Sequence, residues 1–361
     1  MDALRVDLAA CTRAVRVQFS TFEGDAAGQA FAALLLDRVT AGVAVQVILD
    51  GYSEVIADDV YPFAIRGRGV LAAGKRHRIE LLARLEAAGV PIHRVNPPGR
   101  FARYLAFRDH KKMVIVDDRV AYVGGINISD HNYSWHDFMV RVEGRVVADI
   151  VADFTSTWAG ETVALTERRD DRDFVLNECA GRPTILDAAL DLVASARERI
   201  VLESPYLCGD HIEIALLEAA NRGVRVVLVM PRQPNHLHNR VWVRKLRKRL
   251  RHDNIEVLGY PGSDGMTHAK LLIVDDATAT FGSLNYQELE ALTQKELNVF
   301  TRDPQLVAEL RALATADAAV SRPVPRPRSA FGWFTYRVLH WLLRGWTNRL
   351  VRRAAWRAKY C

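Results

Sequence analysis

The chain has 361 residues, of which 49% are hydrophobic and 25% are charged. This is the composition of a globular protein long enough for two domains with buried cores. Its formal net charge of +6 favours a polyanionic partner, either nucleic acid or an anionic lipid surface. The early charges Arg5 and Asp7 argue against a signal peptide, and no apolar stretch reaches the roughly 20 residues of a transmembrane helix.

The cysteines are scattered along the chain. They form no Cys-x-x-Cys pair and have no histidine at the spacing of a metal site, so the sequence predicts neither a disulfide framework nor a zinc site. A reducing cytoplasm is the expected setting. The cysteines are Cys11, Cys179, Cys208 and Cys361.

In chain order, the first half predicts a short strand at residues 15–19, an amphipathic helix at 27–39 and a buried strand at 42–49. Each follows from the spacing of its apolar residues. The first half carries extra residues relative to the second, and we place much of this surplus in residues 52–78, interpreted as a surface excursion.

The second half repeats this order, with a strand at residues 200–203, a helix at 211–221 and a strand at 223–229. Strand, helix and strand alternate in both halves. This alternation predicts an α/β fold with a largely parallel sheet in each half.

One motif, His-x-Lys-x-x-x-x-Asp, occurs twice, starting at His110 and at His268. In each copy an asparagine lies 17 residues beyond the histidine, and an acid follows it at 27 or 28 residues. A fixed order of residue types that occurs twice predicts a duplicated catalytic half and one composite active site. The candidate residues are His110, Lys112, Asp117, Gly125, Asn127 and Asp137 in the first copy and His268, Lys270, Asp275, Ser283, Asn285 and Glu296 in the second.

Each motif is predicted to begin a strand, because residues 114–117 and 271–274 are apolar up to an Asp-Asp turn. Side chains two residues apart in a strand point to the same face, so the histidine and lysine of each copy are expected to project together. The motif aspartates, Asp117 and Asp275, have two open interpretations. They take part in the chemistry, or they stabilise the turn.

These residue types suit attack on a phosphodiester. Lys112 and Lys270 would offset the anionic charge of the phosphate oxygens. One histidine would attack while the other, protonated, gives its proton to the departing alcohol. Asp137 is expected to hold His110 in one tautomer, and Glu296 to hold His268. The supporting residues would bind phosphate oxygens, order the local turn or let the backbone approach the substrate; they are Asn127, Asn285, Gly125 and Ser283.

On these motif residues, the chain resembles the phospholipase D superfamily over roughly residues 10–318, and more narrowly the bacterial cardiolipin synthase branch. Gly124-Gly125 and Ser204-Pro205-Tyr206 support the narrower resemblance. It implies two similar α/β/α-layered halves about a pseudo-twofold axis, with the site between them. It also implies catalysis without metal or cofactor through a phosphohistidine, with His110 as nucleophile and His268 as acid.

For the synthase branch, the resemblance implies phosphatidylglycerol as donor and another phospholipid's head-group hydroxyl as acceptor. Residues 286–290 depart from the family pattern, which has an acid and an Arg-Ser pair after Asn285. Three alternatives stay open: a hydrolase in which water resolves the same intermediate, a nuclease, and a non-catalytic binding protein, which would lack a motif residue. The acceptor lipid, the acyl preference and the oligomeric state are not predicted by the sequence.

Residues 330–361 contain four of the seven tryptophans, several arginines and no acid. This composition predicts an amphipathic helix in the membrane interface, so we expect a peripheral protein on the cytoplasmic face of the cell membrane. A nucleic acid partner is not favoured, because a base-stacking groove would carry single aromatics on strands. The basic run at 240–251 is either a solvated helix face or a contact with lipid phosphate. The predicted domains are 1–165, 166–318, a linker at 319–329 and the helix at 330–361.

Overall fold

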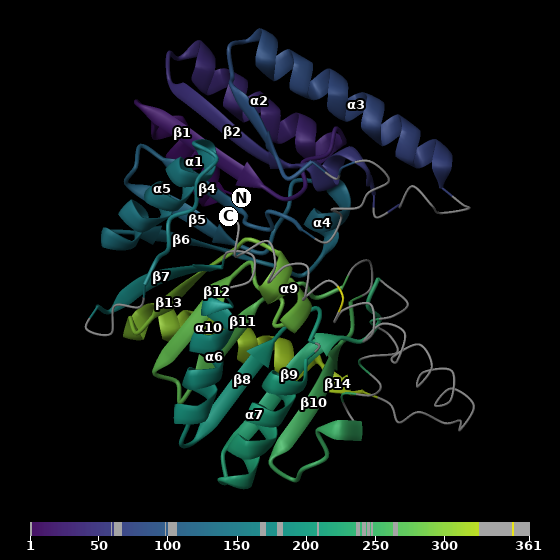
Figure 1. Cartoon of the computed structure of the whole chain (residues 1–361), viewed down its shortest axis with the longest axis vertical. Coiled ribbons are helices and arrows are strands. Elements are labelled where there is room, and N and C mark those ends of the chain that lie inside the picture. Colours follow the sequence, from purple (N-terminus) through teal and green to yellow (C-terminus); the bar gives the residue numbers. More distant parts are fainter. Residues whose placement is uncertain are drawn as a thin grey trace.

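A computed structural model shows two lobes, one above the other along the longest axis (Figure 1). The first lobe is built by roughly the first half of the chain and the second lobe by the remainder. The structure describes residues 2–58, 60, 67–97, 99, 107–166, 171–178, 183–207, 209–235, 239, 243, 246, 248–262, 266–324 and 349.

A six-stranded mixed sheet forms the centre of the first lobe, in the order β3-β2-β1-β4-β5-β6. Only β1, β2 and β3 run parallel to one another, and the others pair antiparallel. The prediction of a largely parallel sheet is wrong here, because β4 and β5 are joined by a turn too short for a parallel crossover. The strands are β1 (Ala14–Phe19), β2 (Ala44–Asp50), β3 (Ile92–Val95), β4 (Met113–Val116), β5 (Val120–Gly124) and β6 (Met139–Glu143).

The second lobe repeats these six strands as β10-β9-β8-β11-β12-β13 and adds one strand at each edge, β14 and β7. Here too only β8, β9 and β10 are parallel to one another. β14 pairs with β10, so the predicted linker at 319–329 begins with the last two residues of a helix (Pro304–Val320) and then contains a short strand. The strands are β7 (Asp173–Glu178), β8 (Arg199–Glu203), β9 (Arg225–Pro231), β10 (Ile255–Tyr260), β11 (Leu271–Val274), β12 (Thr278–Gly282), β13 (Glu296–Thr301) and β14 (Arg322–Pro323).

Helices cover the outer face of each sheet and fill the space between the sheets. α1, α2 and α3 pack on the outer face of the first sheet, and α6 and α7 pack on that of the second. The helices are α1 (Asp2–Ala10), α2 (Ala26–Thr40), α3 (Arg68–Ala87), α4 (Asp130–Ser134), α5 (Arg145–Trp158), α6 (Thr184–Ser195), α7 (Asp210–Asn221), α9 (Glu288–Thr293) and α10 (Pro304–Val320), with a short 3-10 helix at Gly51–Glu54.

The predicted surface excursion at 52–78 is partly wrong. Residues 68–78 belong to α3, whose side chains Leu71, Leu81 and Leu85 are buried against the first lobe. Leucines three and four positions apart lie on one face of a helix. The apolar spacing that identifies this helix therefore begins inside the segment and continues beyond it.

The inner faces of the two sheets share one apolar core. Ile115 of the first sheet and Ile273 of the second belong to the same buried cluster, together with Phe154 of α5 and Leu310 of α10. A core contributed by both lobes joins them into one folded unit. The expectation of two similar α/β halves is confirmed, while the predicted C-terminal helix lies outside the described residues. Within the part of the chain that the structure describes, no helix is both long and apolar enough to cross a bilayer.

A buried polar network crosses between the lobes beside the first motif. Lys111 Nζ donates to Asp153 Oδ2 on α5 at 2.7 Å and to Thr157 Oγ1 at 3.1 Å. The other Asp153 oxygen accepts from Asn177 Nδ2 on β7 at 2.7 Å. Lys111 and Asp153 are 3% and 1% exposed. Because a buried ion needs its partners, the network fixes the first motif to α5 and α5 to the second sheet.

Replacing Asp153 with alanine is expected to lower the free energy of unfolding by about 3–5 kcal/mol, because Lys111 stays buried without its counter-charge. Urea denaturation measures the change. Thr155→Ala, at an exposed position of the same helix, should cost about 0.5 kcal/mol or less. Equal effects of the two substitutions would contradict a structural role for the network.

Candidate active site

Each motif enters the site paired with the acid-bearing segment of the other lobe. The backbone N–H of His110 donates to the carbonyl of Lys295 at 2.8 Å, and that of His268 donates to the carbonyl of His136 at 2.7 Å. Short parallel bridges join the same segments. The two contacts are reciprocal, as a pseudo-twofold arrangement requires, and they place both histidines between the lobes.

The side chains repeat this exchange. His110 Nδ1 lies 3.0 Å from Glu296 Oε1, and His268 Nδ1 lies 2.7 Å from Asp137 Oδ2. The predicted pairing of each histidine with the acid of its own half is therefore wrong. Within one lobe the acid lies at the start of the strand two places away from the motif strand, about 10 Å across the sheet, whereas the facing lobe brings its acid directly against the histidine.

Both motif lysines are buried in this cluster, each 1% exposed. Lys112 Nζ donates to the His110 carbonyl, and Lys270 Nζ donates to the His268 carbonyl at 2.7 Å and lies 2.9 Å from His268 Nδ1. Burial lowers the pKa of Lys112 to about 7 and that of Lys270 to about 8, and the neighbouring carboxylates oppose this change. These lysine charges are poorly solvated, so a bound anion would stabilise them. The lysines lie just before β4 and β11 rather than within them.

The two acids of the cluster differ in ionisation. Burial raises the pKa of Asp137 to about 6, against the charge of Lys270. Burial, the largest single influence, acts in the same direction on Glu296, but the charge and hydrogen bond of His110, the charge of Lys112 and the Ser283 hydroxyl together hold the pKa of Glu296 below its usual value. At neutral pH the carboxylate facing His110 is thus the more firmly ionised of the two.

A glycine and a serine occupy corresponding positions beside these acids. A Cβ atom at Gly125 would lie 2.4 Å from Asp137 Oδ2, so only glycine leaves room for that carboxylate. Ser283 lies at the equivalent place in the second lobe and accepts from the Leu297 N–H at 3.0 Å. A hydrogen bond between Ser283 and Glu296 helps to lower the pKa of Glu296. This one difference contributes to the unequal ionisation of the acids.

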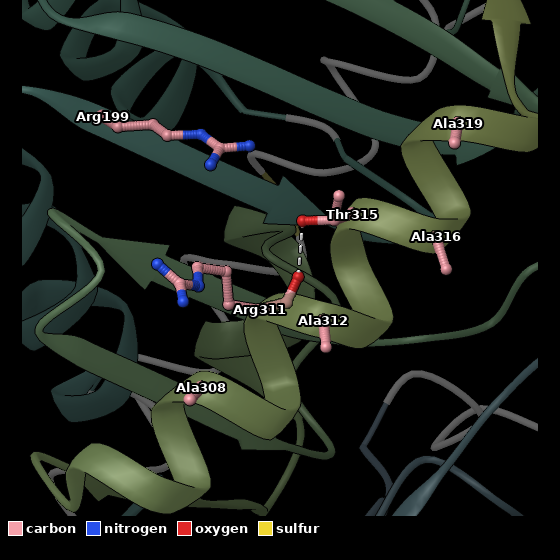
Figure 2. Close-up of a pocket in the computed structure, with 7 residues that line it drawn as sticks. All are labelled: Arg199, Ala308, Arg311, Ala312, Thr315, Ala316 and Ala319. Carbon is pink, nitrogen blue, oxygen red and sulfur yellow. Dashed lines mark hydrogen bonds between the residues drawn. The ribbon is translucent and has the colours of Figure 1, made fainter.

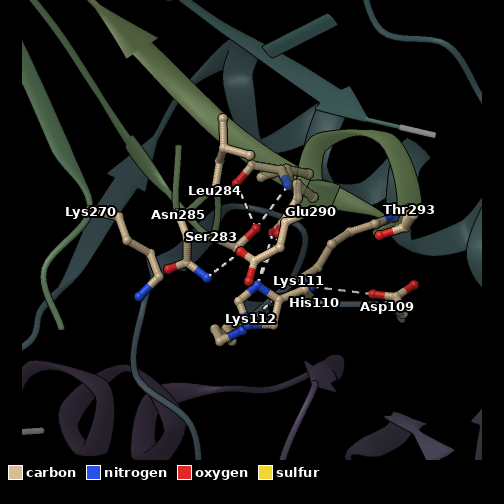
Figure 3. Close-up of polar contacts among 12 residues, drawn as sticks. Asp109, His110, Lys111, Lys112, Lys270, Ser283, Leu284, Asn285, Glu290 and Thr293 are labelled. Atoms are coloured by element: carbon tan, nitrogen blue, oxygen red, sulfur yellow. Dashed lines mark hydrogen bonds and ion pairs between the residues drawn. The ribbon is translucent and has the colours of Figure 1, made fainter. Parts of the chain in front are cut away.

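The two motif asparagines also differ. Asn127 Oδ1 accepts from the Thr21 N–H at 3.1 Å, so its side chain orders the loop after β1. Asn285 Nδ2 instead donates to Glu290 Oε2 on α9 at 2.7 Å (Figure 3). Asn285 is 2% exposed, and its Oδ1 atom has no hydrogen-bond partner among the residues that the structure describes.

Asp117 and Asp275 are not brought into the cluster. Each lies at the far end of its motif strand with a positive φ, 53° and 52°. Asp117 accepts backbone N–H groups at the start of β1, and Asp275 accepts those at the start of β8. Their assignment as catalytic residues is therefore wrong, and of the two open interpretations the structural one holds.

Three residues at the cluster were not predicted as site residues from the sequence. Trp135 and Tyr206 place their ring centres 4.9 Å and 6.0 Å from that of His268. Glu290 was noted only as a departure from the family pattern. The nearness of Trp135 to Asp137 in sequence is a usable signal, whereas Glu290 reaches the site only through the fold of α9.

Two other features lie apart from the cluster. A hollow on the surface of α10 is lined by Arg199, Arg311, Thr315 and a row of alanines and contains no residue of the cluster (Figure 2). Among the basic residues of the 240–251 run that the structure describes, Lys248 and Arg251 are exposed. Arg249 pairs with Asp210 and Glu213 on α7. Across the described ranges, no group of three or more His, Cys, Asp or Glu side chains could hold a metal ion.

The fold and the paired motifs agree with a family match. Residues 4–158 and 189–317 match the family model described as cardiolipin synthase, phospholipase D-like domain, and the chain belongs to this family. The match is interrupted from the end of α5 into α6. This gap contains the predicted domain boundary at 165/166, which itself stays a prediction.

Curated relatives are cardiolipin synthases. The chain is 29% identical to cardiolipin synthase B of Escherichia coli K12, over 83% of this chain and 73% of that protein. It is 25% identical to the probable cardiolipin synthase YwiE of Bacillus subtilis, over 82% of this chain. The chain spans 60% of YwiE and 65% of cardiolipin synthase A of Pseudomonas aeruginosa PAO1, to which it is 27% identical over 89% of its own length.

Solved structures share the two-lobed fold. Phosphatidylserine synthase of Haemophilus influenzae Rd KW20 matches with a TM-score of 0.69 and 13% identity, over 97% of this chain and 92% of that one. Polyphosphate kinase of Porphyromonas gingivalis matches with a TM-score of 0.60 and 13% identity, over 96% and 51%. At these identities the likeness concerns the fold alone.

Glu296→Gln is expected to lower the pKa of His110, because the negative charge of Glu296 favours the protonated ring. Titration of the imidazole nitrogens by NMR measures it. Asp137→Asn is the matched control and should leave the pKa of His110 almost unchanged. The reverse result, with Asp137→Asn acting on His110, would restore the pairing within each half.

Proposed function

We propose that the chain is a phosphatidyltransferase that works through a phosphohistidine intermediate, most closely a cardiolipin synthase. The observation that carries the proposal is the pair of histidine–carboxylate contacts exchanged between the lobes, with a buried lysine beside each histidine. Family membership and the names of the relatives support a phospholipid substrate.

In the first step, His110 attacks the phosphorus of the donor lipid through Nε2. Nδ1–H of His110 donates a hydrogen bond to Glu296, and this tautomer leaves the lone pair of Nε2 free to form the phosphorus–nitrogen bond. The phosphorus–oxygen bond to the head-group alcohol breaks, and His268 gives that oxygen a proton. The firmly ionised carboxylate at His110 favours this assignment of nucleophile over the reverse.

The negative charge of the substrate favours the protonated form of His268, the general acid. Burial and the two lysines hold the pKa of His268 well below its usual value. A phosphodiester bound between Lys112 and Lys270 offsets their charges and raises the pKa of His268, since an anion favours the protonated ring. The proton is thus available when the substrate is present.

In the second step, the acceptor hydroxyl enters where the first alcohol left. His268 takes the hydroxyl proton, the new phosphorus–oxygen bond forms, and the bond to His110 breaks. Phosphatidylglycerol is the proposed donor, and a phospholipid head-group hydroxyl is the acceptor. A hydrolase, in which water replaces the hydroxyl, is the second candidate, because the same residues serve both reactions.

Expressed in a host that lacks cardiolipin synthases, the protein is expected to raise cardiolipin at the expense of phosphatidylglycerol, measured by lipid mass spectrometry. His110→Ala and His268→Ala should each abolish the change, because neither histidine can perform both roles. Arg119→Ala, at an exposed position in the turn beyond β4, should retain it. Accumulation of phosphatidic acid would favour the hydrolase, and unchanged lipids with cleaved DNA would favour a nuclease.

We also propose that the protein acts on the cytoplasmic face of the membrane, with residues 330–361 as its peripheral anchor. The support is compositional, because these residues lie outside those that the structure describes, Arg349 apart. Several cations near an anionic leaflet contribute about 1 kcal/mol each.

Deletion of residues 330–361 is therefore expected to release the protein from liposomes that contain anionic lipid, measured by co-sedimentation. Full-length protein with zwitterionic liposomes provides the control, since the attraction of the cations should be missing there. Undiminished binding of the shortened protein would show that the anchor lies elsewhere.

A further inference from the structure

A third carboxylate, Glu290, stands in the electrostatic cluster without a histidine of its own. It lies on α9, and its charge acts on Lys270, while Lys112, Lys270 and Glu296 act on Glu290 in turn. Asp137 and Glu296 each contact a histidine, whereas the hydrogen bond that the described residues give Glu290 comes from the neutral amide of Asn285. No step of the proposed transfer uses it.

The segment that carries Glu290 is held in place. Tyr286 has a φ of 55°, in the left-handed region, and this turn directs the chain from Asn285 into α9. The carbonyl of Asn285 accepts from Ser204 Oγ at 2.7 Å. Glu288 accepts the His211 N–H at 2.9 Å, which ties α9 to α7. A segment tied in this way to α7 and to the residue after β8 keeps its side chains in position for a ligand.

Asn285 presents a buried acceptor beside the carboxylate of Glu290. The Asn285 amide group turns its N–H toward Glu290, which leaves Asn285 Oδ1 buried and unpaired within the described part of the chain. A buried oxygen without a donor costs free energy, and a ligand that donates to it recovers that cost. Glu290 is half-buried and therefore reachable. The missing partner is a hydrogen-bond donor close to the two motif lysines, whose charges act on Glu290.

The charges around Asn285 and Glu290 favour a neutral hydrogen-bond donor over a cationic one. An ammonium head group would enter beside two buried lysines and be repelled by both. Burial also raises the pKa of Glu290 to about 7, so its negative charge is incomplete at neutral pH. A neutral hydroxyl carries neither penalty and donates equally well to an amide oxygen and to a carboxylate.

We propose that Glu290 and Asn285 form a subsite for the hydroxyl that neighbours the attacking hydroxyl, and so select a vicinal diol as the acceptor. The inference rests on the proposed transfer and names the acceptor class for the same site. A diol held at its second oxygen places its first oxygen toward the phosphohistidine. Water and simple alcohols lack the second contact and compete poorly for the intermediate.

The test supplies purified protein with phosphatidylglycerol in mixed micelles and equal concentrations of propylene glycol and n-propanol, which differ by one hydroxyl. Mass spectrometry gives the ratio of the two phosphatidyl alcohols and the amount of phosphatidic acid. Wild-type protein is expected to favour the diol about tenfold, the effect of one hydrogen bond to a charged group. Since both products arise from one intermediate, the ratio does not depend on how much protein is folded.

Glu290→Ala is expected to bring the ratio close to one and to increase phosphatidic acid relative to both alcohols. Glu290→Gln, which keeps an acceptor oxygen at the same distance, should retain part of the preference. Gln287→Ala is the matched control, because Gln287 precedes the same helix and its side chain makes no capping hydrogen bond there.

Failure of the inference and failure of the proposed function are distinguishable. Equal use of the two alcohols by wild-type protein, or an unchanged ratio in Glu290→Ala, would overturn the diol subsite while leaving the transferase intact. Absence of any phosphatidyl product or released glycerol from wild-type protein would overturn the transferase, and the subsite with it.

Discussion

The site depends on two contacts between imidazole and carboxylate that cross from one lobe to the other. Glu296 reaches His110 and Asp137 reaches His268, and the backbone of each motif is bonded to the segment that carries the opposite acid. A carboxylate withdrawn from water is costly unless a partner satisfies it. The same contacts therefore fix how the lobes dock and how the imidazoles are oriented, so neither lobe contains a complete site.

Burial makes the charged forms of several side chains in the cluster unfavourable, and a bound anion would stabilise them. Burial lowers the pKa of both motif lysines and of both histidines, so their charged forms are disfavoured in the free protein. The neighbouring carboxylates compensate only in part. A phosphate group between the lysines would supply the missing negative charge, in keeping with the phosphodiester substrate that we propose.

The repeated spacing of the sequence was enough to find the histidines, lysines, acids and asparagines, because matched residues at matched spacings fold alike in both halves. It could not give the exchange of acids between halves, since that depends on how the two sheets face one another across a shared core. Asp117 and Asp275 belong to the motif but lie outside the site, because the length of the motif strand separates each aspartate from the histidine and lysine. Glu290 escaped detection because a left-handed residue, Tyr286, turns its helix back toward the cluster.

The small difference between Gly125 and Ser283 shows what fusion of two copies into one polypeptide permits. In an assembly of two identical subunits, any substitution appears on both sides of the symmetry axis. A single gene encoding both copies removes that restraint, so one side could evolve toward accepting a proton while the other evolved toward donating it. Selection can then give the two originally equivalent halves different catalytic roles, one residue at a time.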